Sequence, residues 1–187
     1  MITTIIVALT CVVSLISFKD KNLEFNKLIY SPRRIVKFNE YWRLFSYSLL
    51  HNDFVHLVFN MLALYSFGIV LEQDMGSALF TFLYLSALPI SLIYNLYKNK
   101  NSYSYVACGA SGSVSAVIYS FVLLHPTSLM LVFFIPMPAW LFGVVYLGLS
   151  YWMIKSNRFQ NVGHDVHITG AVYGLLLTLI LMLFKLV

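Results

Sequence analysis

A serine flanked by glycines stands at the head of an apolar stretch of this 187-residue chain, in the run Gly109-Ala110-Ser111-Gly112. A serine hydroxyl acts as a nucleophile when a base lies within hydrogen-bond reach and when donors await the oxyanion that its attack creates. A helix start supplies unpaired backbone N–H groups and a positive dipole end. Ser111 is therefore the candidate nucleophile. The alternative is that the run is a small-residue packing surface, which membrane helices use routinely.

The candidate base is His167, which begins the segment His167-x-x-Gly170-x-x-x-Gly174. Neutral imidazole is the side chain best suited to accept a proton near pH 7. Gly170 and Gly174 share the helix face of His167, and they allow another backbone to approach that face closely. The spacing predicts that this approach brings His167 onto Ser111. The alternative is a histidine at the membrane edge that faces water in a loop.

Two further polar residues, His56 and Asn60, lie four positions apart and therefore project from one face of a helix. Polar side chains in hydrocarbon need partners or water, and both of these can donate hydrogen bonds. They suit an oxyanion site completed by the backbone N–H of Ser111, and their alternative role is hydrogen bonding between helices. His51 and His164 flank these motifs, and we expect both to support loops rather than chemistry.

Metal, disulfide and nucleic-acid sites are disfavoured. The candidate ligands on one side of the predicted membrane are His51, His56, His164, Asp165 and His167. They contain no H-E-x-x-H motif and no cysteine ligand set, so no metal and no cofactor is expected. Cys11 and Cys108 form no CxxC pair. No soluble basic domain suggests a nucleic-acid partner, and no feature of the sequence specifies an oligomeric state.

The composition is that of an integral membrane protein. Hydrophobic residues make up 60% of the chain, charged residues 10%, and the mean hydropathy is +0.81, whereas soluble domains carry about 25% charged residues. A transmembrane helix needs roughly 20 apolar residues, so the chain has room for about six. No repeat or linker divides it, and we expect one all-α domain over residues 1–187 with six transmembrane helices.

The apolar segments place these helices. We expect them over residues 2–18, 52–71, 77–96, 109–124, 139–154 and 164–187. The segment 129–138 contains Pro136 and Pro138, so it cannot continue as one regular helix. The long loop 19–50 combines apolar pairs with basic residues, and we expect it to lie half-immersed in the membrane interface.

The basic residues gather on one side of the membrane. The first loop alone holds Lys19, Lys21, Lys27, Arg33, Arg34, Lys37 and Arg43. Lipid head groups are the natural partners of such a cluster. The loops after the first, third and fifth helices hold eleven of the twelve Lys and Arg residues. By the positive-inside rule, that side should be cytoplasmic.

Taken together and in this order, the motifs resemble those of the rhomboid intramembrane serine proteases. The resemblance covers nearly the whole chain, as the six-helix core form of that family. The matching motifs are Trp42-Arg43, the set His51, His56 and Asn60, Gly109-x-Ser111-Gly112, His167-x-x-Gly170-x-x-x-Gly174 and, more weakly, Glu72-x-x-x-Gly76.

The resemblance implies a catalytic dyad of Ser111 and His167 without an aspartate, and an oxyanion site to which His56 and Asn60 contribute. It implies that transmembrane segments of membrane proteins are the substrates, cut near a membrane end. Family members commonly carry an aromatic residue four positions after the serine, packed against the catalytic histidine, but Ser115 stands there in this chain.

The resemblance also implies a multi-pass protein of a bacterial inner membrane whose active site faces the extracytoplasmic side. The charge count predicts the opposite orientation, and we follow the family because the first loop is long and half-immersed. The helix 139–154 and the loop 155–163 are the expected substrate entrance. The alternative function is a non-catalytic rhomboid-like binder of transmembrane clients, whereas a small transporter would carry polar residues near the middle of several helices.

Overall fold

The computed structural model describes residues 1–19, 25–132, 135–155 and 163–187. The long helices are α1 (Ile2–Lys19), α4 (Phe54–Ser91), α6 (Ser111–Leu124), α7 (Ala139–Lys155) and α8 (His164–Leu183). The short elements are η1 (Phe25–Lys27), α2 (Pro32–Phe38), α3 (Arg43–Ser46), η2 (Tyr47–Leu49), α5 (Ile93–Asn99), β1 (Leu129–Val132) and β2 (Ile135–Pro138). The chain is predominantly helical, which confirms the predicted class.

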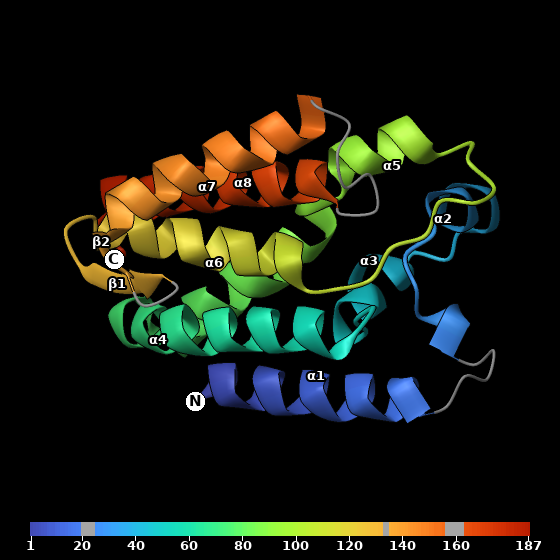
Figure 1. The fold of residues 1–187 in the computed structure, drawn as a ribbon, viewed down its shortest axis with the longest axis horizontal. Helices are drawn as coiled ribbons and strands as arrows, with labels where there is room; N and C mark the ends of the chain where they lie inside the picture. Colours follow the sequence, from blue (N-terminus) through green and yellow to red (C-terminus); the bar gives the residue numbers. More distant parts are fainter. Residues whose placement is uncertain (20–24, 133–134, 156–162) are drawn as a thin grey trace.

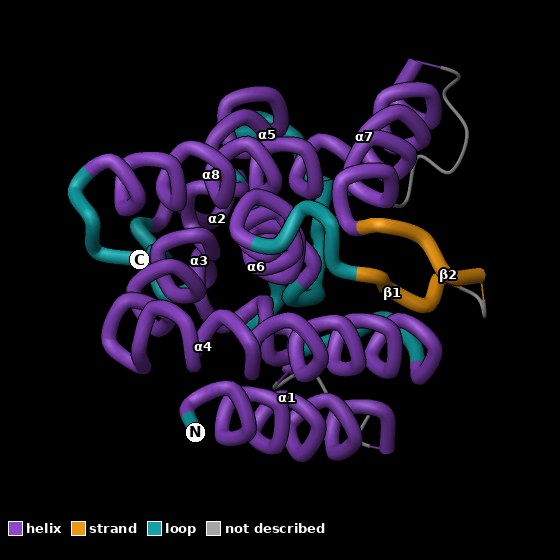
Figure 2. The backbone as a smooth tube through the Cα atoms, turned by 90° about the vertical axis from the view of Figure 1, so that its left-hand side faces the viewer, coloured by secondary structure: helices purple, strands orange, loops and turns teal. Residues whose placement is uncertain are grey.

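Helix α6 lies at the centre of the bundle, with α4 and α8 against it and α1 on the far side of α4 (Figure 1, Figure 2). Every residue from Gly112 to Phe121 is buried. A helix that is apolar and buried on all sides belongs in a core. The residue that opens α6, Ser111, is thereby held in the middle of the molecule rather than on its outer surface.

Helix α4 turns back on itself at Gly76, whose backbone is non-helical, with φ 77° and ψ 157°. Glycine tolerates this left-handed value of φ, which side chains disfavour. The predicted break between the second and third helices is therefore present, as a sharp turn at Gly76. Because the chain turns back, the two ends of α4 lie at the same end of the bundle: His56 contacts Gly109, and Ser91 contacts Gly112.

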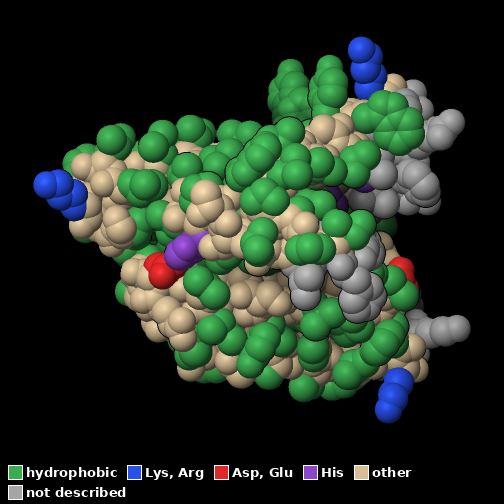
Figure 3. Space-filling view, turned by 60° about the vertical axis from the view of Figure 1, so that its left-hand side comes forward, with side chains coloured by type: hydrophobic (Ala, Val, Ile, Leu, Met, Phe, Trp, Pro, Cys, Tyr) green, Lys and Arg blue, Asp and Glu red, His purple; other side chains and the backbone are tan. Residues whose placement is uncertain are grey.

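Three helical stretches are long and apolar enough to cross a membrane: Ile2–Lys19, Phe54–Asn99 and His164–Leu183. Ser111–Leu124 and Ala139–Trp152 are apolar but shorter. Division of the longest stretch at Gly76 gives six apolar segments in all, and the crossing of the membrane by all six stays a prediction. Figure 3 shows one face of the molecule on which hydrophobic side chains predominate, with the visible Lys and Arg side chains near its edges.

The segment 129–138 forms an antiparallel strand pair, β1 with β2, in which Leu129 lies opposite Pro138. The sequence predicted an apolar connection that cannot continue as one regular helix, and it did not predict the strand pair. The two prolines prevent a helix, as expected. Both prolines lie in β2, and this extended segment pairs with β1 instead.

The described part of the loop 19–50 is structured by a buried ion-pair centre at Glu40. Both Arg34 and Arg43 donate hydrogen bonds to its carboxylate, at 2.5–2.7 Å, and Arg43 also donates to the Ile29 carbonyl oxygen at 2.6 Å. The hydrogen bonds from Arg34, assisted by Arg43, lower the pKa of Glu40 to about 2. Apolar side chains of the same loop stay about half exposed, namely Val36, Phe38, Tyr41, Trp42 and Phe45. The loop is therefore folded on its inner side and apolar on its outer side.

Candidate active site

The hydroxyl of Ser111 lies 2.8 Å from Nε2 of His167. Ser111 is the first residue of α6, and His167 lies one turn into α8. Both side chains are half-buried. The two residues are 56 positions apart in sequence, so only the packing of α8 on α6 brings them together. The sequence predicted this proximity, and the distance is short enough for direct proton transfer.

Two glycines allow this packing. A Cβ atom at Gly170 would overlap the backbone carbonyl oxygen of Gly112, and one at Gly174 would overlap that of Ala116. The seam continues away from the site through the hydroxyl of Ser120, which lies 3.3 Å from the Gly174 carbonyl oxygen. Small residues let two helix backbones approach closely. The predicted role of Gly170 and Gly174 is confirmed.

The backbone at the start of α6 is open to an incoming negative charge. Among the described residues no side chain caps this helix end, so its first N–H groups are free to bind an oxyanion. His56 lies directly beside it, since a Cβ atom at Gly109 would fall 2.6 Å from Cε1 of the His56 ring. Gly109 also has a φ of +123°, which side chains rarely adopt. Position 109 therefore requires glycine for two reasons, the lack of space beside the His56 ring and the positive φ.

Asp53 fixes His56 in the first turn of α4. Its carboxylate accepts a hydrogen bond of 2.8 Å from the His56 backbone N–H, which is the usual capping arrangement at a helix start. The predicted helix began at residue 52, whereas α4 begins at Phe54, directly after this cap.

Asn60 lies on the same face of α4 as His56, as its spacing predicted, but its described hydrogen bond stays within its own helix. Its side-chain nitrogen donates to the His56 carbonyl oxygen at 2.9 Å, and the residue is 6% exposed. This bond uses one of the two N–H groups of the Asn60 amide and leaves the second available to an oxyanion. His56 is distinguished from Asn60, which the sequence treated alike, because the His56 ring lies directly beside Gly109.

The ring of His51 packs against the ring of His56. Its Nδ1 lies 3.0 Å from the hydroxyl of Ser14, and that hydroxyl donates its proton to the Leu49 carbonyl oxygen at 2.8 Å. Nδ1 of His51 must therefore carry the proton in this bond. The His51 and His56 rings meet edge to face at 5.0 Å. Burial, with a smaller contribution from His56, lowers the pKa of His51 to about 4, so this ring is neutral at pH 7.

Two contacts to α8 are ones that the sequence did not predict. Asn95 of α5 donates hydrogen bonds of 2.8 Å to both Tyr105 and Asp165, which ties the start of α8 to its neighbours. Tyr146 of α7 lies face to face with His167, at a centroid distance of 6.3 Å and an interplanar angle of 30°. No motif marks either residue. The His164 ring also meets the His167 ring edge to face, at a centroid distance of 6.0 Å.

The described residues contain no group of three or more His, Cys, Asp or Glu side chains placed to hold a metal ion. Both cysteines are free; Cys108 makes a 3.0 Å contact with the side-chain oxygen of Asn52. The loop 155–163, which the sequence proposed as part of a substrate entrance, lies outside the described residues except at its two ends.

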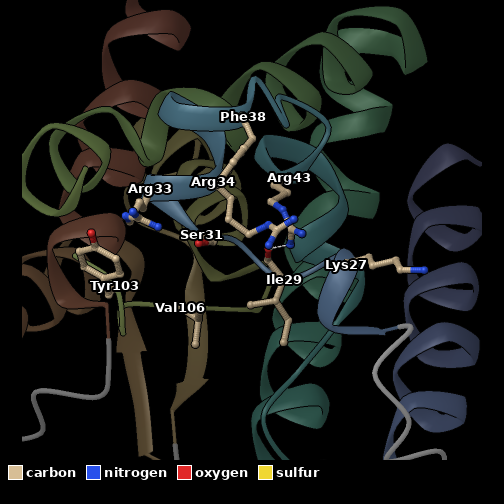
Figure 4. Close-up of a pocket in the computed structure, with 9 residues that line it drawn as sticks. All are labelled: Lys27, Ile29, Ser31, Arg33, Arg34, Phe38, Arg43, Tyr103 and Val106. Atoms are coloured by element: carbon tan, nitrogen blue, oxygen red, sulfur yellow. Dashed lines mark hydrogen bonds between the residues drawn. The ribbon is translucent and has the colours of Figure 1, made fainter. Parts of the chain in front are cut away.

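A basic cavity of about 530 Å³ opens in the loop region between α1 and α5 (Figure 4). Its lining residues are Lys27, Ile29, Ser31, Arg33, Arg34, Phe38, Arg43, Tyr103 and Val106. The guanidinium of Arg33 stacks 3.6 Å above the Tyr103 ring. The cavity therefore presents positive charge beside apolar surface.

Comparison with known proteins agrees with the motifs. The family described as "Rhomboid domain" matches residues 38–184. "Rhomboid protease GlpG" of Haemophilus influenzae is 27% identical over 94% of this chain and 88% of its own length. "RHOMBOID-like protein 12, mitochondrial" of Arabidopsis thaliana is 33% identical over 65% of this chain, and "Rhomboid protein 1, mitochondrial" of Saccharomyces cerevisiae is 31% identical over 67%. The matched regions span 40% and 38% of those two longer relatives.

Proposed function

This chain belongs to the rhomboid family of integral membrane proteins, and from that premise we propose that it is an intramembrane serine endopeptidase that cleaves transmembrane segments. The observation that carries the proposal is the 2.8 Å hydrogen bond between Ser111 Oγ and His167 Nε2. A nucleophile and a base in such contact, at the uncapped start of a buried helix, are the parts that acyl transfer needs.

In the proposed reaction, Nε2 of His167 accepts the Ser111 proton as Oγ attacks the carbonyl carbon of the scissile peptide. The carbonyl oxygen becomes an oxyanion, held by backbone N–H groups at the start of α6, by His56 and by the second N–H of the Asn60 amide. His167 then donates the proton to the leaving amine, which gives an acyl-enzyme. A water molecule, deprotonated by His167, hydrolyses the ester and regenerates the serine.

The substrate class follows from where the dyad lies. A peptide carbonyl inside a transmembrane helix is hydrogen-bonded and shielded, so the substrate must unwind locally before Ser111 can reach it. We expect cleavage near a membrane end of the substrate, with small or helix-breaking residues beside the cut. The exposed edge at α7 is the entrance that we propose.

Cleavage of a labelled transmembrane substrate in detergent or liposomes tests this function. We expect wild type to cleave it, and Ser111→Ala and His167→Ala to lose at least about a thousandfold in rate. The alternative function, a non-catalytic rhomboid-like binder of transmembrane clients, predicts binding without cleavage. A fluorophosphonate probe separates the two, because only an activated Ser111 reacts with it. Equal cleavage by wild type and Ser111→Ala would remove the protease assignment.

For the cellular setting we propose a multi-pass protein of a bacterial inner membrane with its active site toward the extracytoplasmic side. The extensive match to a bacterial relative supports this location, and the mitochondrial relatives make a mitochondrial membrane the alternative. Fractionation of the native cells distinguishes them.

We further propose that the basic cavity lies at the level of the lipid head groups and contacts anionic lipid. The positive charge of Arg33 and the exposed rings of Phe38 and Trp42 support this. Flotation with vesicles that contain phosphatidylglycerol tests it. Unchanged lipid preference in an Arg33→Gln variant would contradict it.

A further inference from the structure

Helix α7 lies at the edge of the bundle, with its axis inclined away from α6 and α8 (Figure 2). Most of its large side chains are 43–64% exposed, namely Trp140, Val144, Val145, Leu149, Tyr151 and Trp152. Tyr146 differs from them. It is half-buried, and it is directed inward against the ring of the candidate base.

The Tyr146 ring is held in place by α6 and by its own helix. Its hydroxyl lies 3.4 Å from the hydroxyl of Ser115, which is 1% exposed. The rings of Tyr119 and Phe142 lie 6.1 and 5.8 Å away. Ser115 is small, so it leaves the space beside His167 that the Tyr146 ring occupies. The His167 imidazole thereby has a ring from α7 stacked beside it, with the two centroids 6.3 Å apart.

This contact matters because a single hydrogen bond does not fix an imidazole. The bond from Nε2 to Ser111 leaves the ring free to rotate about the line that joins the two atoms. A stacked aromatic ring removes that freedom. It also favours the imidazolium that forms when His167 accepts the serine proton, because an aromatic face attracts a cation.

We propose that Tyr146 is a positioning residue for His167, so that the alignment of the dyad depends on the docking of α7. This inference rests on the proposed protease function and deepens it. When α7 is packed against α6 and α8, the Tyr146 ring holds the base in line with Ser111. The helix at the proposed substrate entrance is then also the helix that completes the catalytic geometry.

Kinetics on the full chain in detergent micelles test the proposal, with a labelled transmembrane substrate. We expect Tyr146→Leu to lower kcat about 10- to 100-fold with little change in KM, because misalignment of a catalytic group acts on the chemical step. Tyr146→Phe keeps the ring, so it should stay within about threefold of wild type. The matched control is Tyr94→Leu, which changes an exposed tyrosine of α5 outside the proposed entrance and should leave kcat unchanged.

A rescue variant separates positioning from loss of structure. Ser115 lies one turn after Ser111 on α6, next to the space that Tyr146→Leu vacates. A ring placed there by Ser115→Phe can cover the same face of His167. The double variant should therefore raise kcat about tenfold above Tyr146→Leu alone. If Tyr146→Leu lowers Tm, Tyr146→Met serves in its place, since methionine fills the volume without an aromatic face.

Histidine-labelled protein gives a readout that does not depend on cleavage. The Hε1 resonance of His167, assigned with His167→Gln, should carry the ring-current shift of a stacked aromatic residue. That shift should persist in Tyr146→Phe and disappear in Tyr146→Leu.

These experiments test the role of Tyr146 separately from the proposed protease function. Full activity of Ser111→Ala would overturn the protease proposal. If Ser111→Ala is inactive while Tyr146→Leu keeps the wild-type kcat and the His167 resonance, the protease proposal stands and the role of Tyr146 is wrong.

Discussion

The two ends of the helical bundle treat their polar side chains in opposite ways. At the end where α4 turns back, the carboxylate of Glu72 is 4% exposed and accepts four hydrogen bonds of 2.6–2.9 Å. The donors are the backbone N–H groups of Ile2 and Thr3 and the hydroxyls of Thr3 and Ser77. At the same end, His125 contacts Asp74 at 2.7 Å. This network ties α1 to both halves of α4.

At the Ser111 end, several buried polar atoms of the described residues have no hydrogen-bond partner. Among the described residues, the buried side-chain atoms without a hydrogen-bond partner are Thr10 Oγ1, Tyr30 Oη, His51 Nε2, Asn95 Oδ1, Ser113 Oγ and His164 Nε2. All except that of Thr10 belong to segments at the Ser111 end. Buried polar groups are normally paired, so these atoms are the ones that water or a bound molecule would satisfy. The contrast teaches that the Glu72 end is closed by its own hydrogen bonds, whereas the Ser111 end keeps polar atoms unpaired beside its own satisfied groups, such as those around Glu40.

The largest effect on stability should come from Glu72→Ala. It leaves four donors without their acceptor, which should cost about 3 kcal/mol of unfolding free energy. Thermal unfolding in detergent measures this, and the exposed neighbour Gln73→Ala is the control. Activity per folded molecule should be unchanged. A Glu72→Ala protein that is inactive yet fully stable would remove the contrast between the two ends.

The next effect separates His56 from Asn60. His56→Ala removes a donor beside the start of α6 and should lower kcat about a hundredfold. Asn60→Ala should cost less, about tenfold, because the Asn60 amide is engaged within its own helix. His125→Ala at the opposite end is the matched control and should leave kcat unchanged. Equal losses for His56→Ala and Asn60→Ala would contradict this ranking of the two donors.

The smallest effect is a pH dependence of stability at the Ser111 end. The pKa of His51 is about 4 in the folded protein, against 6.5 for an unperturbed histidine. Between these values the unfolded chain binds the proton and the folded chain does not, so stability falls as the pH falls below 6.5. The loss should reach about 2 kcal/mol at pH 5.

Thermal unfolding of wild type and His51→Gln between pH 7.5 and 5 checks this, and the glutamine variant should lack this part of the dependence. Glu40 does not interfere. Its lowered pKa contributes stability that is lost only as the pH falls from 4.5 through about 2. Parallel curves for the two proteins would contradict the assigned pKa of His51.

Much of the fold was predictable from local features. The apolar segments located the long helices to within a few residues, because burial in lipid requires a continuous run of apolar side chains. Gly170 and Gly174 predicted the close seam between α8 and α6. Less predictable were α2 and α3, which the sequence treated as a loop, and the pairing of β1 with β2. These short elements depend on contacts such as the one between Arg43 and the Ile29 carbonyl oxygen, which no periodicity reveals.

By itself, the sequence determined which residues could do chemistry and which helices carry them. Residue type, spacing and hydropathy are properties of single segments, and they pointed to Ser111 and His167. Only the tertiary structure decided the 2.8 Å approach of those two side chains, the approach of the His56 ring to Gly109 and the stacking of Tyr146 near His167. These contacts depend on the relative positions of helices that are far apart in the chain, and helix positions are set by packing rather than by any one segment.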